Sequence, residues 1–66
     1  MKLTRLRHVR ERKAFTQQEL ASTANVSRTT VARIEAGLDD PYPSTVRKLA
    51  QALGVEPGEL MGPEEA

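Results

Sequence analysis

Apolar residues recur along this chain at intervals of three and four positions, which is the spacing of one face of an α-helix. Near the start they are Leu3, Leu6 and Val9, and shorter sets follow at residues 20–24 and 31–34. No segment of the sequence alternates apolar and polar residues as a β-strand does. The pattern therefore predicts a compact all-α domain of five helices, at residues 3–13, 16–24, 27–36, 44–54 and 57–61.

The second and third helices carry clear boundary signals. Thr16 can cap the second helix, and Glu19 stands three residues further on, as in a capping box. Asn25 follows this helix and is one of the few non-glycine residue types that tolerate a positive φ. Ser27 can cap the third helix, and Gly37 can end it. Two short helices joined by so tight a turn are typical of the helix-turn-helix motif, which binds DNA.

An irregular segment follows this helix pair. Residues 37–43 contain two prolines and two aspartates, so we expect no helix there. Ser44 is the predicted cap of the fourth helix and Gly54 its predicted end. Pro57 suits the first turn of the last helix. We assign residues 1–61 to one helix-turn-helix domain and residues 62–66 to an acidic C-terminal tail.

The predicted core is aliphatic because Phe15 and Tyr42 are the only aromatic residues. Its members are Leu6, Val9, Phe15, Leu20, Ala21, Val26, Val31, Ile34, Val46, Leu49, Leu53, Val55 and Leu60. Arg10 is the exception on the apolar face of the first helix, and a charge in such a position needs a partner. Glu35 follows the core residue Ile34 at the end of the third helix and is the best candidate for that partner.

Composition narrows the class of function. The chain has 66 residues, no cysteine and a single histidine, His8, which has no neighbours suited to a metal site. No Ser/His/Asp set and no phosphate-binding glycine loop is present, so an enzyme is disfavoured and we expect no metal and no cofactor. The apolar runs are too short for a signal peptide or a membrane span. We therefore expect a cytoplasmic, nucleoid-associated protein.

The net charge of +1 conceals an uneven distribution of charge. Residues 1–36 carry eight basic and three acidic residues, whereas residues 37–66 carry two basic and six acidic ones. A basic half is what a phosphate-facing surface requires. The acidic half would then face away from DNA or face a protein partner.

The outward face of the third helix holds the candidate DNA-reading residues. At about 100° per residue, Arg28, Thr29 and Arg33 lie opposite the apolar Val31 and Ile34. Arginine matches the O6 and N7 atoms of guanine, and threonine can bond a base or pack on a thymine methyl group. Two arginines alone would be interpreted as solvated charges, but within a helix-turn-helix they become candidate base contacts.

The matching segments LRHVRERKAFTQQELA, NVSRTTVARIEAG and STVRKLAQALGVEPGEL occur in order, and together they resemble the Cro/repressor-type (XRE) helix-turn-helix family. The resemblance covers residues 3–61. It implies a lambda-repressor-like domain of five helices that binds double-stranded operator DNA, usually as a symmetric homodimer. Two positions depart from the family, since Ala14 and Asn25 stand where glycine is common. Ala14 would be strained by about 1 kcal/mol if its φ is positive.

The resemblance also implies roles for individual residues. The base-contacting positions fall on Arg28, Thr29 and Arg33, and a structural ion pair falls on Arg10 and Glu35. The positions expected to contact phosphate are Gln17, Ser27, Thr30 and Ser44. The loop that approaches the DNA backbone in the family holds Asp39 and Asp40 here, so these carboxylates either point away or weaken that contact.

Two functions follow as hypotheses. The first is a sequence-specific transcriptional regulator, a repressor, whose dimer binds a pseudo-palindromic operator with residues 27–36 in the major groove. The second is a protein-interaction module of the same fold, antitoxin-like or coactivator-like, which meets a basic partner through the acidic residues Asp39, Asp40, Glu56 and Glu59.

The predicted dimer interface lies near the chain terminus. It consists of Val55, Pro57, Leu60 and Met61, where apolar residues gather after the fourth helix. For Leu60 the alternative is that this side chain closes the hydrophobic core.

Overall fold

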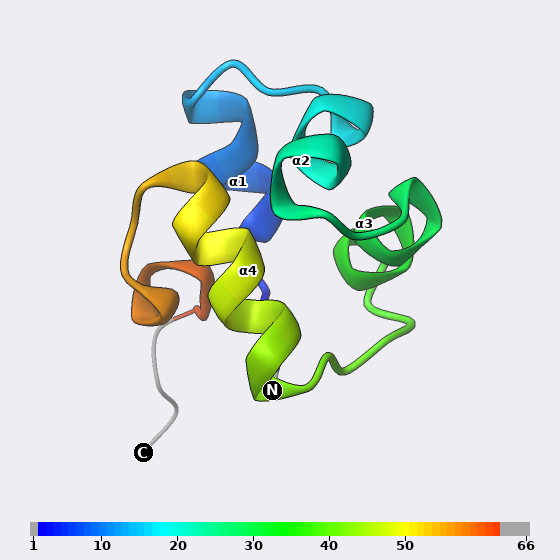
Figure 1. Cartoon of the computed structure of the whole chain (residues 1–66). Helices are drawn as coiled ribbons and strands as arrows, with labels where there is room; N and C mark the ends of the chain where they lie inside the picture. Colours follow the sequence, from blue (N-terminus) through cyan, green and yellow to red (C-terminus); the bar gives the residue numbers. More distant parts are fainter. Residues whose placement is uncertain (1, 63–66) are drawn as a thin grey trace.

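The computed structural model describes residues 2–62. They form four α-helices and one 3-10 helix, which are α1 (Leu6–Arg12), α2 (Gln17–Ala24), α3 (Arg28–Glu35), α4 (Pro43–Leu53) and η1 (Pro57–Leu60). Helix α2 packs against both α3 and α4, and η1 packs against α4 and α1 (Figure 1). The described residues contain no strand, so the predicted all-α class is confirmed.

The prediction of five α-helices is wrong in its last member. Residues 57–60 form a single 3-10 turn, in which Glu59 donates its backbone N–H to the carbonyl of Glu56 at 2.9 Å. Glycine at position 58 is a poor helix former, so four residues do not sustain an α-helix there. The first helix is also shorter than predicted. It starts at Leu6, and the N–H of its N-cap Arg5 bonds to the carbonyl of Leu60, the last residue of η1, at 3.0 Å.

Helix α4 begins one residue earlier than its expected cap. Tyr42 is the N-cap, no side chain caps the helix, and Pro43 occupies the first helical position. Proline is favoured there because its φ is fixed near the helical value and it has no N–H to leave unpaired. Ser44 is therefore an exposed residue of the first turn and not the cap that the sequence indicated.

The helix-turn-helix itself follows the predicted boundary signals. Thr16 and Glu19 form the capping box, with both hydrogen bonds near 3 Å. Asn25 adopts the left-handed conformation with φ of 60°. Ser27 accepts a hydrogen bond from the N–H of Thr30 at 3.0 Å and so caps α3. These local interactions fix the direction in which α3 leaves the turn.

All four α-helices end in the same way. In each, the chain turns back through one residue of positive φ, and the next N–H bonds to a carbonyl five residues earlier, as in a Schellman motif. The four residues of positive φ are Ala14, Asn25, Gly37 and Gly54. Ala14, with φ of 62°, carries the strain that the sequence suggested for it.

Most of the predicted core is buried. The buried apolar residues are Leu3, Leu6, Val9, Leu20, Ala21, Ala24, Val31, Ile34, Val46, Leu49, Ala50, Leu53 and Leu60. Phe15, Val26 and Val55 were predicted to be core residues but are only partly buried against it. Each precedes or follows a helix, so its side chain closes the edge of the core.

Replacement of Ala14 by glycine should stabilise the protein. The change removes the left-handed strain at Cβ but also increases the entropy of the unfolded chain, so we expect a net gain of about 0.5 kcal/mol in the free energy of unfolding. Urea denaturation of Ala14→Gly against the wild type measures this gain. Ala36→Gly is the matched control, because Ala36 is exposed and has the ordinary φ of −79°. If both glycines destabilise the protein equally, position 14 is not strained.

Candidate nucleic-acid interface

A nearly buried ion pair lies beneath the candidate interface and connects α1 to α3. Arg10 of α1 donates from Nε to Oε2 of Glu35 at 2.6 Å and from Nη2 to Oε1 at 3.1 Å. The side chains of the two residues are 10% and 5% exposed. The hydrogen bond with Glu35 raises the pKa of Arg10 above its ordinary value and outweighs the opposite effect of burial. The first and third helices are therefore joined at the residues that the sequence had paired.

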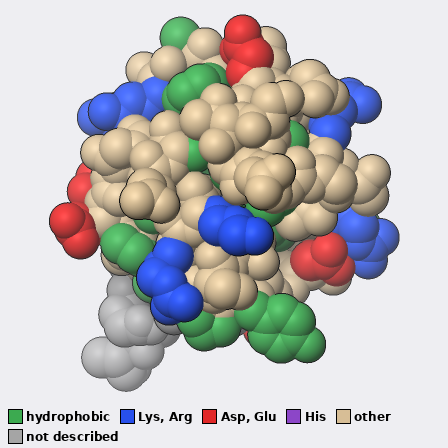
Figure 2. All heavy atoms as spheres, in the orientation of Figure 1, with side chains coloured by type: hydrophobic (Ala, Val, Ile, Leu, Met, Phe, Trp, Pro, Cys, Tyr) green, Lys and Arg blue, Asp and Glu red, His purple; other side chains and the backbone are tan. Residues whose placement is uncertain are grey.

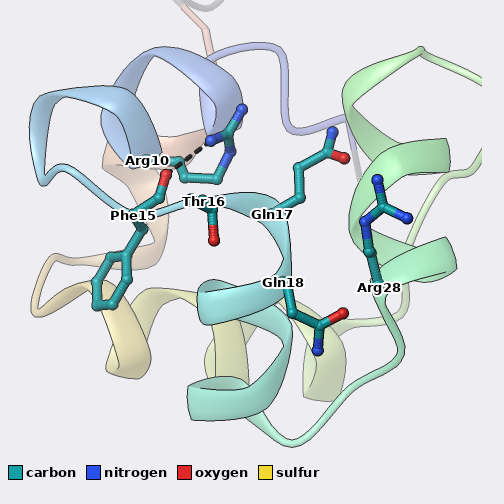
Figure 3. Close-up of a pocket in the computed structure, with 6 residues that line it drawn as sticks. All are labelled: Arg10, Phe15, Thr16, Gln17, Gln18 and Arg28. Carbon is teal, nitrogen blue, oxygen red and sulfur yellow. Dashed lines mark hydrogen bonds between the residues drawn. The ribbon is translucent and has the colours of Figure 1, made fainter.

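The same two side chains also hold the start of α2. Nη1 of Arg10 donates to the carbonyl oxygen of Phe15 at 2.7 Å, just before the helix begins (Figure 3). Nε2 of Gln17, the first residue of α2, donates to Oε1 of Glu35 at 3.0 Å. The ion pair thus connects the start of α2 to the end of α3, which also pack directly against each other. The amide of Gln17, expected on a phosphate, already has a partner in the unbound protein.

Helix α3 divides its residues between core and surface. Val31 and Ile34 are buried, whereas Arg28, Thr29 and Arg33 are exposed. Buried residues on one side leave the other side of the helix turned outward. The three candidate base contacts therefore share the solvent-facing surface of α3.

The predicted phosphate contacts do not form one cluster. The hydroxyl groups of Ser27 and Thr30 lie 2.8 Å apart at the start of α3 and bond to each other. Ser44 is exposed on the first turn of α4. Gln17 lies on the first turn of α2, where the N–H groups have no acceptor within the helix.

A hollow separates the starts of α2 and α3. It has a volume of about 530 Å³ and is lined by Arg10, Phe15, Thr16, Gln17, Gln18 and Arg28. Gln17 and Gln18 project from α2, and Arg28 faces the same space from the first turn of α3 (Figure 3). Two amides, a guanidinium group and the positive end of a helix dipole favour an anionic ligand.

One contact of α3 was not predicted. Nε of Arg33 donates to Oδ1 of Asp39 at 3.1 Å, and the two side chains are 50% and 39% exposed. Figure 2 shows Lys and Arg side chains with an acidic side chain beside them, on the edge formed by α3 and the loop after it. The only sequence signal was an aspartate six positions after an arginine, and this spacing suggests no pairing within a helix.

The predicted dimer surface is only partly available. Leu60 has no exposed surface and closes the core between α1 and α4, so it is not an interface residue. Val55, Pro57 and Met61 are half-buried and keep some surface for a partner.

Two other apolar side chains are more exposed. Among the described residues, the exposed large hydrophobic side chains are Leu38, at 65%, and Tyr42, at 79%. Both lie in the segment between α3 and α4. Figure 2 shows hydrophobic side chains along the lower edge of the molecule, near the start of α4. Neither residue was among those predicted from the sequence to form the dimer interface.

The helices of residues 2–62 are all too short and too polar to cross a membrane. Nor do His, Asp and Glu side chains gather within this range in a group that could hold a metal ion.

The arrangement defines a helix-turn-helix protein, with α2 supporting an outward-facing α3. A family model described as helix-turn-helix matches residues 6–60, and the chain belongs to this family. Residues 63–66, the greater part of the predicted acidic tail, lie outside the described structure.

Two known proteins are similar to this chain. An immunity repressor protein of Bacillus phage phi105 is 37% identical over 60 residues, which make up 91% of this chain. The match spans only 42% of the length of that repressor. The crystal structure of the restriction-modification controller protein C.AhdI from Aeromonas hydrophila superposes with a TM-score of 0.84, at 36% identity and over 88% of each chain. Both relatives place this chain among Cro/repressor-type helix-turn-helix proteins.

Substitution of Glu35 by glutamine should strongly destabilise the fold. It leaves the buried guanidinium of Arg10 with only the more distant and exposed carboxylate of Glu11, at 3.9 Å, as a counter-charge, which costs about 3 kcal/mol. Urea denaturation followed by circular dichroism measures the loss. Glu11→Gln is the control, because Glu11 is 56% exposed, bonds to Arg7 on the surface and approaches Arg10 only to 3.9 Å. Its removal should cost less than about 0.5 kcal/mol.

A double variant separates the cost of leaving a buried charge unpaired from the net contribution of the ion pair to stability. Arg10→Met with Glu35→Leu removes both charges and should recover most of the stability that Glu35→Gln loses. If Glu35→Gln and Glu11→Gln lower the free energy of unfolding equally, the buried pair does not have the expected importance for stability.

Proposed function

We propose that this protein is a sequence-specific DNA-binding regulator of transcription that inserts α3 into the major groove. The observation that carries the proposal is the division of α3, which buries Val31 and Ile34 and exposes Arg28, Thr29 and Arg33. Helix-turn-helix proteins contact base edges with the first turns of this second helix. The similarity to an immunity repressor and to a restriction-modification controller supports the same role, and supports repression as its mode.

Arginine side chains are the proposed source of sequence preference. Arg28 is the first residue of α3 and Arg33 lies in its last turn. In the proposed complex they would therefore contact different base pairs. Each can bond the O6 and N7 atoms of a guanine, and Thr29 can contact a neighbouring base or a thymine methyl group.

Phosphate contacts would hold α3 in register with the groove. The N-terminal N–H groups of α2 and the hollow beside Gln17 and Arg28 suit one phosphate group. For Gln17 to use its side chain as well, the amide must leave Glu35 or share it. Ser27, Thr30 and Ser44 are the further proposed contacts on the backbone of the DNA.

A dimer is the proposed DNA-bound form, since one helix contacts too few bases to be selective. Two copies would place their α3 helices about 34–36 Å apart, on the half-sites of a pseudo-palindromic operator. Val55, Pro57 and Met61 are the proposed contacts between copies. Such a protein would act in the cytoplasm, at the nucleoid.

The alternative role as a protein-interaction module has weaker support. It depends on Asp39, Asp40, Glu56 and Glu59 as a surface for a basic partner. Asp39 is paired with Arg33, and the carboxylate of Glu59 accepts the N–H of Glu56 at 3.2 Å. The carboxylates of Asp39 and Glu59 are therefore already engaged within the chain.

Selection of bound sequences from a random duplex library tests the function directly. The wild type should enrich a two-fold-symmetric site, and its affinity should fall steeply as salt increases. Arg28→Ala and Arg33→Ala should each lose about 1–3 kcal/mol and relax the preference at one base per half-site.

Arg12→Ala is the matched control, because Arg12 is an exposed arginine at the end of α1. It should change affinity equally on all sequences and leave every base preference intact. Wild-type binding without any enriched sequence would contradict the proposed function.

Dimerisation can be tested separately by sedimentation equilibrium. Met61→Glu should raise the dissociation constant of the dimer by about tenfold or more, because a carboxylate buried at an interface without a partner is unfavourable. Leu38→Glu is the control on the competing apolar surface and should leave the dimer intact. If Leu38→Glu dissociates the dimer and Met61→Glu does not, the interface lies at the loop between α3 and α4.

A further inference from the structure

The end of α3 brings an acidic side chain back to the DNA-facing helix. Gly37 has φ of 77° and donates its N–H to the carbonyl of Ile34 at 3.0 Å. The N–H of Leu38 bonds to the carbonyl of Arg33 at 2.9 Å. This turn reverses the chain, so the residue after Leu38 lies beside the last turn of the helix. Asp39 is that residue, and its carboxylate meets the guanidinium of Arg33.

The contact with Asp39 uses only one of the three guanidinium nitrogens of Arg33, which decides which nitrogens remain available for a base. The hydrogen bond to Asp39 is donated by Nε, on the side of the guanidinium group. The two terminal nitrogens, Nη1 and Nη2, form the end of the same planar group. A guanidinium held by Nε can still present that end to the O6 and N7 atoms of a guanine, with its plane fixed by the aspartate.

The position of the pair argues against a purely structural role. Both side chains are about half exposed, and ion pairs with such exposure contribute little to the stability of a fold. The pair nevertheless restricts a long, flexible side chain on the proposed DNA-contacting surface. It also sets a negative charge beside a residue that would otherwise bind any phosphate group within reach.

We propose that Asp39 is a specificity-determining residue, which orients Arg33 toward a guanine and disfavours its contact with phosphate. This inference rests on the proposed DNA-binding function. Preorganisation lowers the entropy lost when Arg33 binds its base. Contact with phosphate is available to Arg33 on every sequence, whereas the guanine is available at the operator. By disfavouring the phosphate contact and orienting Arg33 for guanine, the carboxylate widens the gap in affinity between the operator and other DNA.

The test compares the wild type with Asp39→Ala, Arg33→Ala and the double variant. Each is titrated against three duplexes, namely the selected operator, the operator with the guanine at the Arg33 position replaced, and an unrelated sequence. Asp39→Ala should reduce discrimination at that base by about tenfold, and should leave discrimination at the Arg28 position unchanged. Its affinity for the unrelated duplex should rise severalfold. In the Arg33→Ala background, Asp39→Ala should not change discrimination at all.

Asp40→Asn is the matched control, because it removes one negative charge from the adjacent position of the same loop. It should leave discrimination at the Arg33 position as in the wild type, and thermal unfolding should verify that all variants are folded. The inference is overturned if Asp40→Asn reproduces the effect, if Asp39→Ala keeps full discrimination, or if the effects of Arg33→Ala and Asp39→Ala add. These results leave the proposed function intact, since the wild type still selects its operator. If the wild type selects no sequence, both proposals fall.

Discussion

The proposed DNA-facing surface of this protein depends on a nearly buried ion pair that makes no proposed contact with bases. Arg10 and Glu35 join α1 to the end of α3, and their remaining donors and acceptors take the carbonyl of Phe15 and the amide of Gln17. Three helices therefore meet at two side chains. A small aliphatic core does not by itself fix the relative angles of short helices, because apolar contacts are non-directional. Hydrogen bonds from a planar guanidinium group are directional, and they supply that constraint.

Local interactions then determine where the candidate residues lie on α3. Ser27 fixes the first turn of the helix and Asn25 fixes the direction of the chain before it. Since α3 is only two turns long, burial of Val31 and Ile34 sets its rotation completely. No residue of α3 can change face without losing the core contacts of those two side chains. The ion pair, the turn before α3 and the core therefore together determine the orientation of the outward face of α3.

The sequence predicts the parts of this arrangement that arise from short-range chemistry. Three features follow from the chemistry of single residue types. They are the capping box at Thr16, the left-handed conformation of Asn25 and the pairing of Arg10 with an acidic residue. Predictions failed where two local preferences competed, as when Pro43 at the first helical position displaced Ser44 from the cap. They also failed where tertiary packing decided the outcome. Leu60, which the sequence assigned both to the core and to the dimer interface, is fully buried and leaves no surface for a partner, while its neighbour Met61 keeps some surface.

The distribution of charge shows why linear sequence is a poor guide to the faces of so small a domain. The basic first half and the acidic second half suggested that the acidic groups would face away from DNA or face a protein partner. The Schellman turn at Gly37 instead returns Asp39 to Arg33, so one acidic group lies against the helix that carries the candidate base contacts. With a net charge of only +1, the protein as a whole is attracted to a polyanion less strongly than a highly basic protein, and local basic groups must supply the attraction. Its binding must then come from a few well-placed contacts, and a carboxylate beside an arginine costs non-specific affinity while it restricts where that arginine can bind.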